Sequence, residues 1–200
     1  MTLPGPRVAD LPIARELRNT ACELGFEMSC TPRMGALLQV LAATKPVGRL
    51  LELGTGVGVG TSYLAAGLAP SASLTTVELD GTLQAHARQL LSRPNIRFVT
   101  GDAAEYITNC GQKFDLIFAD TWAGKFTHLS ETLELLNIGG LYVIDDLLPQ
   151  PAWPDGHAPK VPVLLNTLAG SEFLEGIEMD WDTGLALYVR LRREQEEDHS

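Results

Sequence analysis

Four glycines between residues 54 and 60 carry the clearest chemical signal in this sequence. Gly54, Gly56, Gly58 and Gly60 follow the apolar run at residues 50–53, and a helix-like apolar segment comes after them. Glycine adopts positive φ and lets a ligand approach the main chain, while the N–H groups that open a helix attract polar or anionic groups. The spacing therefore predicts a strand, a loop and a helix that together bind a cofactor.

The same spacing disfavours a dinucleotide as that cofactor. A dinucleotide fingerprint that starts at Gly54 needs glycine or alanine where Val59 stands. One that starts at Gly56 needs it where Thr61 stands. Glu52, two residues before the first glycine, would repel a pyrophosphate but suits a cofactor that carries positive charge. S-adenosylmethionine is such a cofactor.

Acidic residues follow the other predicted strands. Ligands of open α/β sheets bind outside the carboxyl ends of the strands, near the point where the strand order reverses. Glu78 lies 24 residues beyond Gly54, close to the distance of about 20 at which an acidic side chain accepts hydrogen bonds from ribose hydroxyls. Asp102 could accept from an adenine amino group. The alternative for each acid is that it caps a helix or faces water.

Three of these acids have the chemistry of a metal site. Asp120, Asp145 and Asp146 offer hard oxygen ligands of the kind that Mg²⁺ or Ca²⁺ requires. Either a divalent cation lies among them, or at least one carboxyl turns away or has a raised pKa. A metal there would lower the pKa of an acceptor hydroxyl and hold its oxygen in line with a sulfonium methyl group.

Apolar periodicity indicates the elements that must position these residues. Two helices are expected before the sheet, at residues 10–25 and 32–44, the second capped by Thr31. The expected strands are 49–53, 74–78, 96–100, 114–119 and 141–144, and the expected helices between them are 61–69, 82–91, 103–109 and 127–136. This alternation of strands and helices predicts a parallel sheet.

The C-terminal part has a different pattern. After a proline-rich loop at 149–162 and a helix at 163–169, Ile177, Met179 and Trp181 alternate with acidic residues, which predicts a half-exposed strand and a hairpin. We therefore expect an α/β fold, a Rossmann-like, seven-stranded, mostly parallel sheet with helices on both faces and an antiparallel C-terminal hairpin strand. It should form one domain over residues 1–200, with helices in 1–45 covering the site and a frayed tail at 192–200.

Composition narrows the class of protein. The 200 residues are 45% hydrophobic and 20% charged, which is typical of a soluble globular domain. No apolar run approaches the roughly 18 residues of a membrane span, and residues 1–12 lack a signal-peptide pattern, so a cytoplasmic location is expected. A net charge of −10 disfavours nucleic acid or an anionic membrane as partner and favours a small molecule. The three cysteines show no metal-ligand spacing, so reduced thiols are expected.

Four segments together resemble the class I S-adenosylmethionine-dependent O-methyltransferases of the catechol and caffeoyl-CoA type. They are ELGTGVGVG, TTVELD, FDLIFADTW and GGLYVIDD, in the order and spacing of that family, and the resemblance covers about residues 28–190. It implies methyl transfer from S-adenosylmethionine to an oxygen of a small, hydroxylated aromatic acceptor, assisted by Mg²⁺ or another divalent cation. Related bacterial enzymes suggest a homodimer.

The resemblance also implies roles for individual residues. Glu78 would bind the ribose of the cofactor, and Asp102 and Ala103 would lie beside its adenine. Trp122 would form an aromatic wall of the site. Residues 28–31 resemble the segment that folds over the cofactor. The implied cofactor-binding residues are Glu52, Gly54, Thr55, Gly56, Gly58, Thr61, Glu78, Asp102, Ala103, Asp120 and Trp122, the metal ligands are Asp120, Asp145 and Asp146, and the catalytic residues are Lys125 and Asp120.

The sequence departs from the family pattern at three places. The family usually has serine where Gly60 stands, so Thr61 or Ser62 must bind the cofactor carboxylate or the contact is lost. The catalytic lysine normally occupies the position of Ala123. Lys125 reaches the site if the intervening glycine permits an altered backbone, and its alternative is a solvated surface lysine. The third metal ligand, an aspartate here, is typically asparagine.

Other functions stay open at this point. The altered lysine position leaves room for a metal-independent methyltransferase that acts on nitrogen or on a larger substrate. A nicotinamide oxidoreductase is disfavoured by the glycine spacing, and a noncatalytic protein that keeps the cofactor fold is a further alternative. Trp153, His157 and Lys160 lie in a stretch expected to border the acceptor pocket, although structural roles are favoured for the histidines of this chain.

Overall fold

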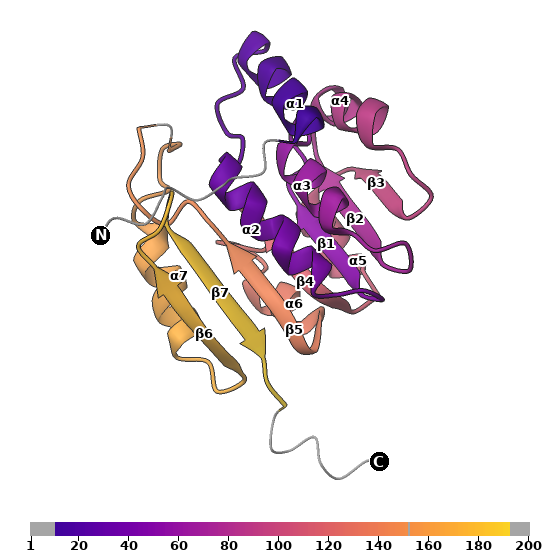
Figure 1. Cartoon of the computed structure of the whole chain (residues 1–200). Helices are drawn as coiled ribbons and strands as arrows, with labels where there is room; N and C mark the ends of the chain where they lie inside the picture. The colour runs from indigo at the N-terminus through magenta and orange to yellow at the C-terminus, as the bar shows by residue number, and fades with distance from the viewer. Residues whose placement is uncertain (1–10, 152, 193–200) are drawn as a thin grey trace, which may run out of the picture.

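One sheet of seven strands forms the centre of the part of the chain that the computed structural model describes, residues 11–151 and 153–192 (Figure 1). The strand order is β3-β2-β1-β4-β5-β7-β6. The bounds are β1 (Arg49–Leu53), β2 (Ser73–Glu78), β3 (Ile96–Thr100), β4 (Phe114–Ala119), β5 (Leu136–Ile144), β6 (Leu174–Met179) and β7 (Leu185–Arg190). Strands β1 to β5 are parallel, whereas β7 is antiparallel to both β5 and β6. The predicted fold class, with its antiparallel hairpin, is confirmed.

Helices cover both faces of this sheet (Figure 1). They are α1 (Pro12–Glu23), α2 (Pro32–Ala43), α3 (Val59–Gly67), α4 (Gly81–Leu91), α5 (Ala103–Asn109), α6 (Leu129–Glu134) and α7 (Lys160–Ala169). Apolar side chains of α1 to α4 pack with Leu50 of β1 on one face, and those of α5 to α7 pack with Leu51 and Leu53 on the other. This division follows from the alternation of side chains along a strand, which also puts Glu52 on the face that α3 covers.

The connection between β4 and β5 differs from the prediction. A helix was expected over 127–136, but α6 begins at Leu129 because His128 has φ 53°, and Leu136 already pairs with Phe114 as the first residue of β5. The apolar residues at 133, 135 and 136 fit a helix or a buried strand equally well. Periodicity alone therefore could not place this boundary.

Other boundaries move by smaller amounts. Helix α3 begins at Val59 rather than Thr61, and α7 begins at Lys160, inside the expected proline-rich loop. Strand β6 ends at Met179, so Trp181 lies beyond the strand on which it was expected. The expected tail lies outside the described residues from position 193 onward. Among the helices described, not one combines the length and apolar character that crossing a bilayer requires.

Candidate functional site

Two adjoining cavities lie at the carboxyl ends of β1, β2, β4 and β5, where the strand order reverses. The first, which we call the glycine-loop cavity, has a volume of about 370 Å³ and is lined by the loop after β1 and by Glu78. The second, the carboxylate cavity, has a volume of about 120 Å³ and contains Lys125 and the three aspartates. Both share Asp120 and Trp122. The arrangement offers room for two ligands that meet at Asp120.

The glycine loop is built for close backbone approach. Gly54 and Gly58 have φ of 99° and 100°, and a Cβ on Gly54 would lie 2.7 Å from the carbonyl oxygen of Asp120. The backbone N–H of Gly56 donates to Glu78 Oε2 at 2.7 Å, and the N–H of Asp80 donates to Oε1 at 3.0 Å. Two backbone donors therefore fix the Glu78 carboxylate at the edge of the glycine-loop cavity.

Glu52 is a buried carboxyl beneath this loop. Its Oε2 accepts hydrogen bonds from the hydroxyls of Thr61 and Thr76, at 2.5 and 2.6 Å. Its Oε1 is buried and has no partner within residues 11–151 and 153–192. Burial raises the pKa of Glu52 to about 7, against the opposing effect of the two hydroxyl donors. A cation placed near the loop would stabilise the charged form of this group.

A chain of hydrogen bonds holds Glu52 in this position. Gln84 Nε2 donates to the Thr55 hydroxyl at 3.1 Å, and Thr55 and Thr76 are hydrogen-bonded at 2.6 Å. Because Thr76 donates to the carboxylate, the Thr55 hydroxyl must be the donor to Thr76. Thr61, which was expected to bind the cofactor, donates to Glu52 and is fully buried. Its structural contact is thus with the carboxylate beneath the loop.

The absence of the family serine at position 60 has a steric reason. A Cβ at Gly60 would lie 2.7 Å from Glu52 Oε1, closer than real Cβ contacts come. With Oε2 held by two hydroxyls, the carboxylate has little freedom to move away. Asp102, also expected near the cofactor, caps α5 by accepting from the N–H of Ala104 at 2.7 Å, and neither it nor Ala103 lines the two cavities.

The three aspartates expected to bind metal come together at the ends of β4 and β5. Carboxylate oxygens of Asp120, Asp145 and Asp146 lie within 4.8 Å of one another. Burial, and then the neighbouring Asp145, raise the pKa of Asp120 well above its ordinary value. Burial also raises the pKa of Asp145 to about 7, although Lys125 lowers it. Lys125 therefore does not offset the cost of burying these carboxylates, and a further cation would favour their charged forms.

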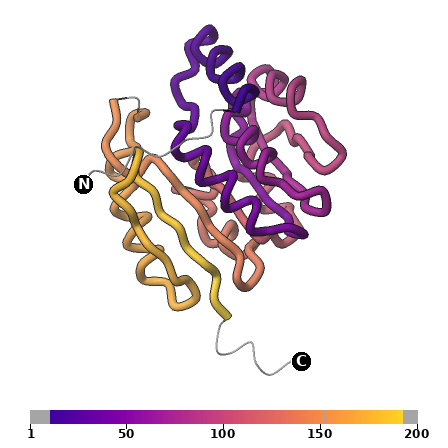
Figure 2. The backbone as a smooth tube through the Cα atoms, viewed as in Figure 1, coloured from indigo at the N-terminus to yellow at the C-terminus, as the bar shows by residue number. Residues whose placement is uncertain are grey.

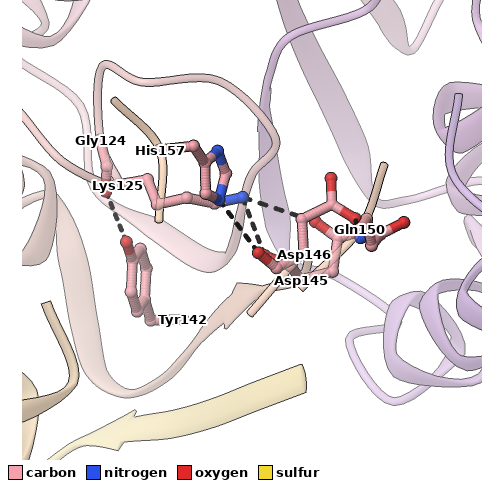
Figure 3. A network of polar contacts seen from close by, with 7 residues as sticks. All are labelled: Gly124, Lys125, Tyr142, Asp145, Asp146, Gln150 and His157. Carbon is pink, nitrogen blue, oxygen red and sulfur yellow. Dashed lines mark hydrogen bonds and ion pairs between the residues drawn. The ribbon is translucent and has the colours of Figure 1, made fainter. Parts of the chain in front are cut away.

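Figure 3 shows Lys125 reaching toward Asp145 of this cluster. The residue is 3% exposed. Its Nζ donates to the carbonyl oxygen of Asp145 at 2.9 Å and lies 3.7 Å from Asp145 Oδ1, an ion pair too long for a hydrogen bond. The positive φ of Gly124, 91°, provides the altered backbone that the shifted lysine needs. The alternative of a solvated surface lysine is therefore wrong.

His157 makes structural contacts, as the sequence favoured, and it also lines the carboxylate cavity. Its ring is buried, stacks on Trp153 with centroids 4.3 Å apart, and contacts Phe126 edge-on at 4.8 Å. Its Nε2 lies 3.1 Å from the carbonyl oxygen of Asp146, and Gln150 Nε2 donates to Asp146 Oδ1 at 2.6 Å (Figure 3). Because a carbonyl oxygen only accepts, Nε2 carries the hydrogen of this bond, and burial lowers the pKa of His157. The only sequence signal was its closeness to Trp153.

Comparison with known proteins shows what this chain is similar to. A family model of a methyltransferase domain matches residues 51–147, from β1 to just beyond Asp146. A protein of Mycolicibacterium vanbaalenii named as an O-methyltransferase is 31% identical over 139 residues, which are 66% of this chain and 61% of that protein. Over these residues the chain is similar to proteins named as O-methyltransferases, and it covers less than two thirds of the length of this first relative. The predicted resemblance is confirmed.

Further comparisons extend the similarity to most of the chain. A Mycobacterium ulcerans protein, also named as an O-methyltransferase, is 27% identical over 89% of this chain and 84% of its own length. The O-methyltransferase TomG of Streptomyces achromogenes, solved with S-adenosylmethionine, superposes with a TM-score of 0.78 at 21% identity. That alignment covers 93% of this chain and 92% of TomG, and it shows that the two share a fold.

Proposed function

We propose that this protein transfers the methyl group of S-adenosylmethionine to an oxygen of a small, hydroxylated aromatic acceptor, with assistance from a divalent cation. One observation carries the proposal. The glycine-loop cavity, with Glu52 beneath it, opens beside a second cavity that holds three carboxylates and a buried lysine. The names of the curated relatives and the S-adenosylmethionine bound to TomG support the same reaction and cofactor.

The glycine-loop cavity suits a cationic nucleoside. In the proposed complex, Glu78 would accept hydrogen bonds from the ribose hydroxyls while its own position is fixed by two backbone N–H groups. Glu52 would supply negative charge beneath the sulfonium end of the cofactor. Trp122, at the boundary of both cavities, would form an aromatic wall. The adenine contacts expected for Asp102 and Ala103 stay a prediction.

The carboxylate cluster fits a divalent cation. Asp120, Asp145 and Asp146 provide hard oxygen donors, and Asp145 Oδ1 is a buried atom without a hydrogen-bond partner among the residues described. When bound, Mg²⁺ would lower the pKa of an acceptor hydroxyl. Lys125 Nζ would lie against the same oxygen and stabilise its negative charge as the proton leaves. The protein would otherwise act by aligning oxygen, methyl and sulfur.

Binding and turnover test the proposal in that order. Calorimetry with S-adenosylmethionine and S-adenosylhomocysteine should show saturable binding of both, and absence of binding would refute the cofactor. A screen of vicinal dihydroxy aromatic acceptors in Mg²⁺ or in chelator then tests the reaction and its metal. Lys125→Met should lower kcat about 100-fold or more with S-adenosylhomocysteine affinity unchanged. An unchanged kcat would remove Lys125 from the mechanism.

One observation favours a second candidate, a methyltransferase that works without metal. Lys125 already places a positive charge 3.7 Å from Asp145 Oδ1, inside the cluster that a metal would occupy. Full activity in chelator would select this alternative, which includes acceptors with nitrogen nucleophiles or of larger size.

The remaining expectations about the whole protein are proposals of the same kind. We propose one domain over residues 1–200, a cytoplasmic location, a small-molecule acceptor as partner, and a homodimer. The single sheet supports the single domain, because one apolar core packs against each of its two faces. Sedimentation equilibrium would test the dimer directly.

A further inference from the structure

The segment at residues 26–31 between α1 and α2, which we call the strap, forms a wall of both cavities. Met28, Ser29 and Cys30 line the glycine-loop cavity and the carboxylate cavity alike. The hydroxyl of Ser29 is buried and has no hydrogen-bond partner in the part of the chain that is described. A ligand that extends across the two cavities would therefore contact the strap. The placement of the strap must then affect how well that ligand binds.

A turn far along the sequence holds the end of the strap. The Thr31 hydroxyl donates a short hydrogen bond to Asp182 Oδ2, in the turn at residues 181–184 between β6 and β7. The same hydroxyl oxygen accepts from the N–H of Met34 at 3.0 Å and so caps α2. One residue beyond the start of α2, the guanidinium of Arg33 lies 4.8 Å from the centroid of the Trp181 ring. Figure 2 shows this turn beside the start of α2.

The backbone of the same turn is also hydrogen-bonded to the segment that follows Asp145 and Asp146, on another side of the carboxylate cavity. The N–H of Leu148 donates to the carbonyl oxygen of Thr183 at 2.9 Å, and the N–H of Leu147 donates to that of Gly184 at 3.3 Å. These two leucines directly follow the aspartates of the carboxylate cavity. A Cβ on Gly184 would lie 2.5 Å from the Leu148 nitrogen, so the close approach depends on glycine. The turn at residues 181–184 is thus hydrogen-bonded both to the end of the strap and to the two residues that follow Asp146.

We propose that the turn at residues 181–184 is a positioning element of the methyl-transfer site, in which Asp182 fixes the strap against both cavities. Asp182 acts through Thr31 and touches neither proposed ligand, so it is a positioning residue. The inference rests on the proposed function, because the ligand that the strap contacts is the proposed cofactor. It predicts that removing Asp182, which lines neither cavity, as the acceptor for Thr31, which lines the carboxylate cavity, weakens cofactor binding.

Two substitutions at the same position provide a matched test. Asp182 has φ 58°, a conformation that glycine and asparagine tolerate, so Asp182→Gly removes the acceptor without backbone strain and Asp182→Asn keeps an acceptor oxygen. Asp182→Gly should weaken S-adenosylhomocysteine binding roughly fivefold to tenfold, about the effect of losing one ordinary hydrogen bond. KM for S-adenosylmethionine should rise by a similar factor while kcat changes less than about twofold. Asp182→Asn should restore most of the affinity.

Hydrogen exchange of the ligand-free protein gives a second readout. In Asp182→Gly, amides of residues 26–31 should exchange faster while those of β1 keep their protection, which also shows that the variant is folded. Thr31→Val and Thr31→Ser repeat the comparison from the other side of the bond. Unchanged exchange in the strap, or faster exchange with unchanged affinity, would overturn the inference. If the parent protein binds no S-adenosylhomocysteine, the proposed function fails first and the inference fails with it.

Discussion

At the scale of single residues, Glu52 is a buried carboxyl whose charged form is unfavourable in the ligand-free protein. The carboxyl is 1% exposed, and two threonine hydroxyls satisfy only one of its oxygens. A buried carboxyl with half of its hydrogen bonds favours the protonated form, which is why its pKa rises to about 7. Such a group costs stability in the empty protein and becomes useful when a cationic ligand arrives.

Glu52→Gln should therefore change how stability depends on pH. Because the folded pKa of about 7 exceeds the ordinary value of 4.5, the folded state holds the proton more tightly, so the contribution of Glu52 is largest below about pH 4.5. That contribution is lost as pH rises through 7. Relative to Glu52→Gln, the parent should lose about 3 kcal/mol of unfolding free energy between pH 4.5 and 8. Urea unfolding of both ligand-free proteins measures this, and parallel profiles would contradict it.

At the scale of elements, the start of α3 decides whether the loop can take its shape. Gly58 has φ 100° at the N-cap of α3, and a Cβ there would lie 2.4 Å from Ala87 Cβ on α4. Local conformation and packing between two helices thus both demand glycine at this one position. The conformation of the loop before α3 therefore depends on the close packing of Gly58 against Ala87.

Gly58→Ala should destabilise the protein by about 2 kcal/mol or more, because it combines overpacking with a left-handed backbone that disfavours a side chain. It should also weaken S-adenosylhomocysteine binding. Gly111→Ala is the matched control, since a Cβ added there would meet nothing within 4 Å and the φ of Gly111 is not positive. Denaturant unfolding should place that control within about 0.5 kcal/mol of the parent. Equal losses in both variants would refute the packing argument.

At the scale of the whole molecule, the sheet makes two separate sets of residues into one site. The glycine loop follows β1, whereas the aspartates follow β4 and β5, and the parallel pairing of β1, β4 and β5 brings these carboxyl ends to one edge. A cation that binds only when this edge is assembled must stabilise the folded molecule as a whole.

Mg²⁺ should therefore raise the free energy of unfolding of the parent, by about 2.7 kcal/mol when its concentration is 100 times its dissociation constant. Asp145→Asn should abolish that increase, because it removes a charged ligand from the buried cluster. Glu175→Gln, on the exposed face of β6, should leave the increase intact. Thermal unfolding with and without metal measures all three proteins. No increase in the parent, or an equal one in Asp145→Asn, would argue against the metal.

Much of this molecule could be predicted locally. The bounds of β1, β3, β4 and α5 agree with apolar periodicity, and the glycine spacing identified the loop. These features depend on the φ that each residue tolerates and on the face that each side chain must bury, both properties of neighbouring residues. The boundary between α6 and β5 was not predicted, because the same apolar pattern is compatible with a helix and with a buried strand.

What the sequence determined by itself was the order of the elements, the fold class and the acids at the strand ends, since short-range patterns encode them. The tertiary structure decided that Lys125 is buried beside Asp145, that His157 bonds the carbonyl of Asp146, and that Thr31 meets Asp182 across 151 positions of sequence. Such contacts join separate loops whose meeting depends on how helices and strands pack. The spacing of residues within one loop does not indicate which other loop that segment will contact.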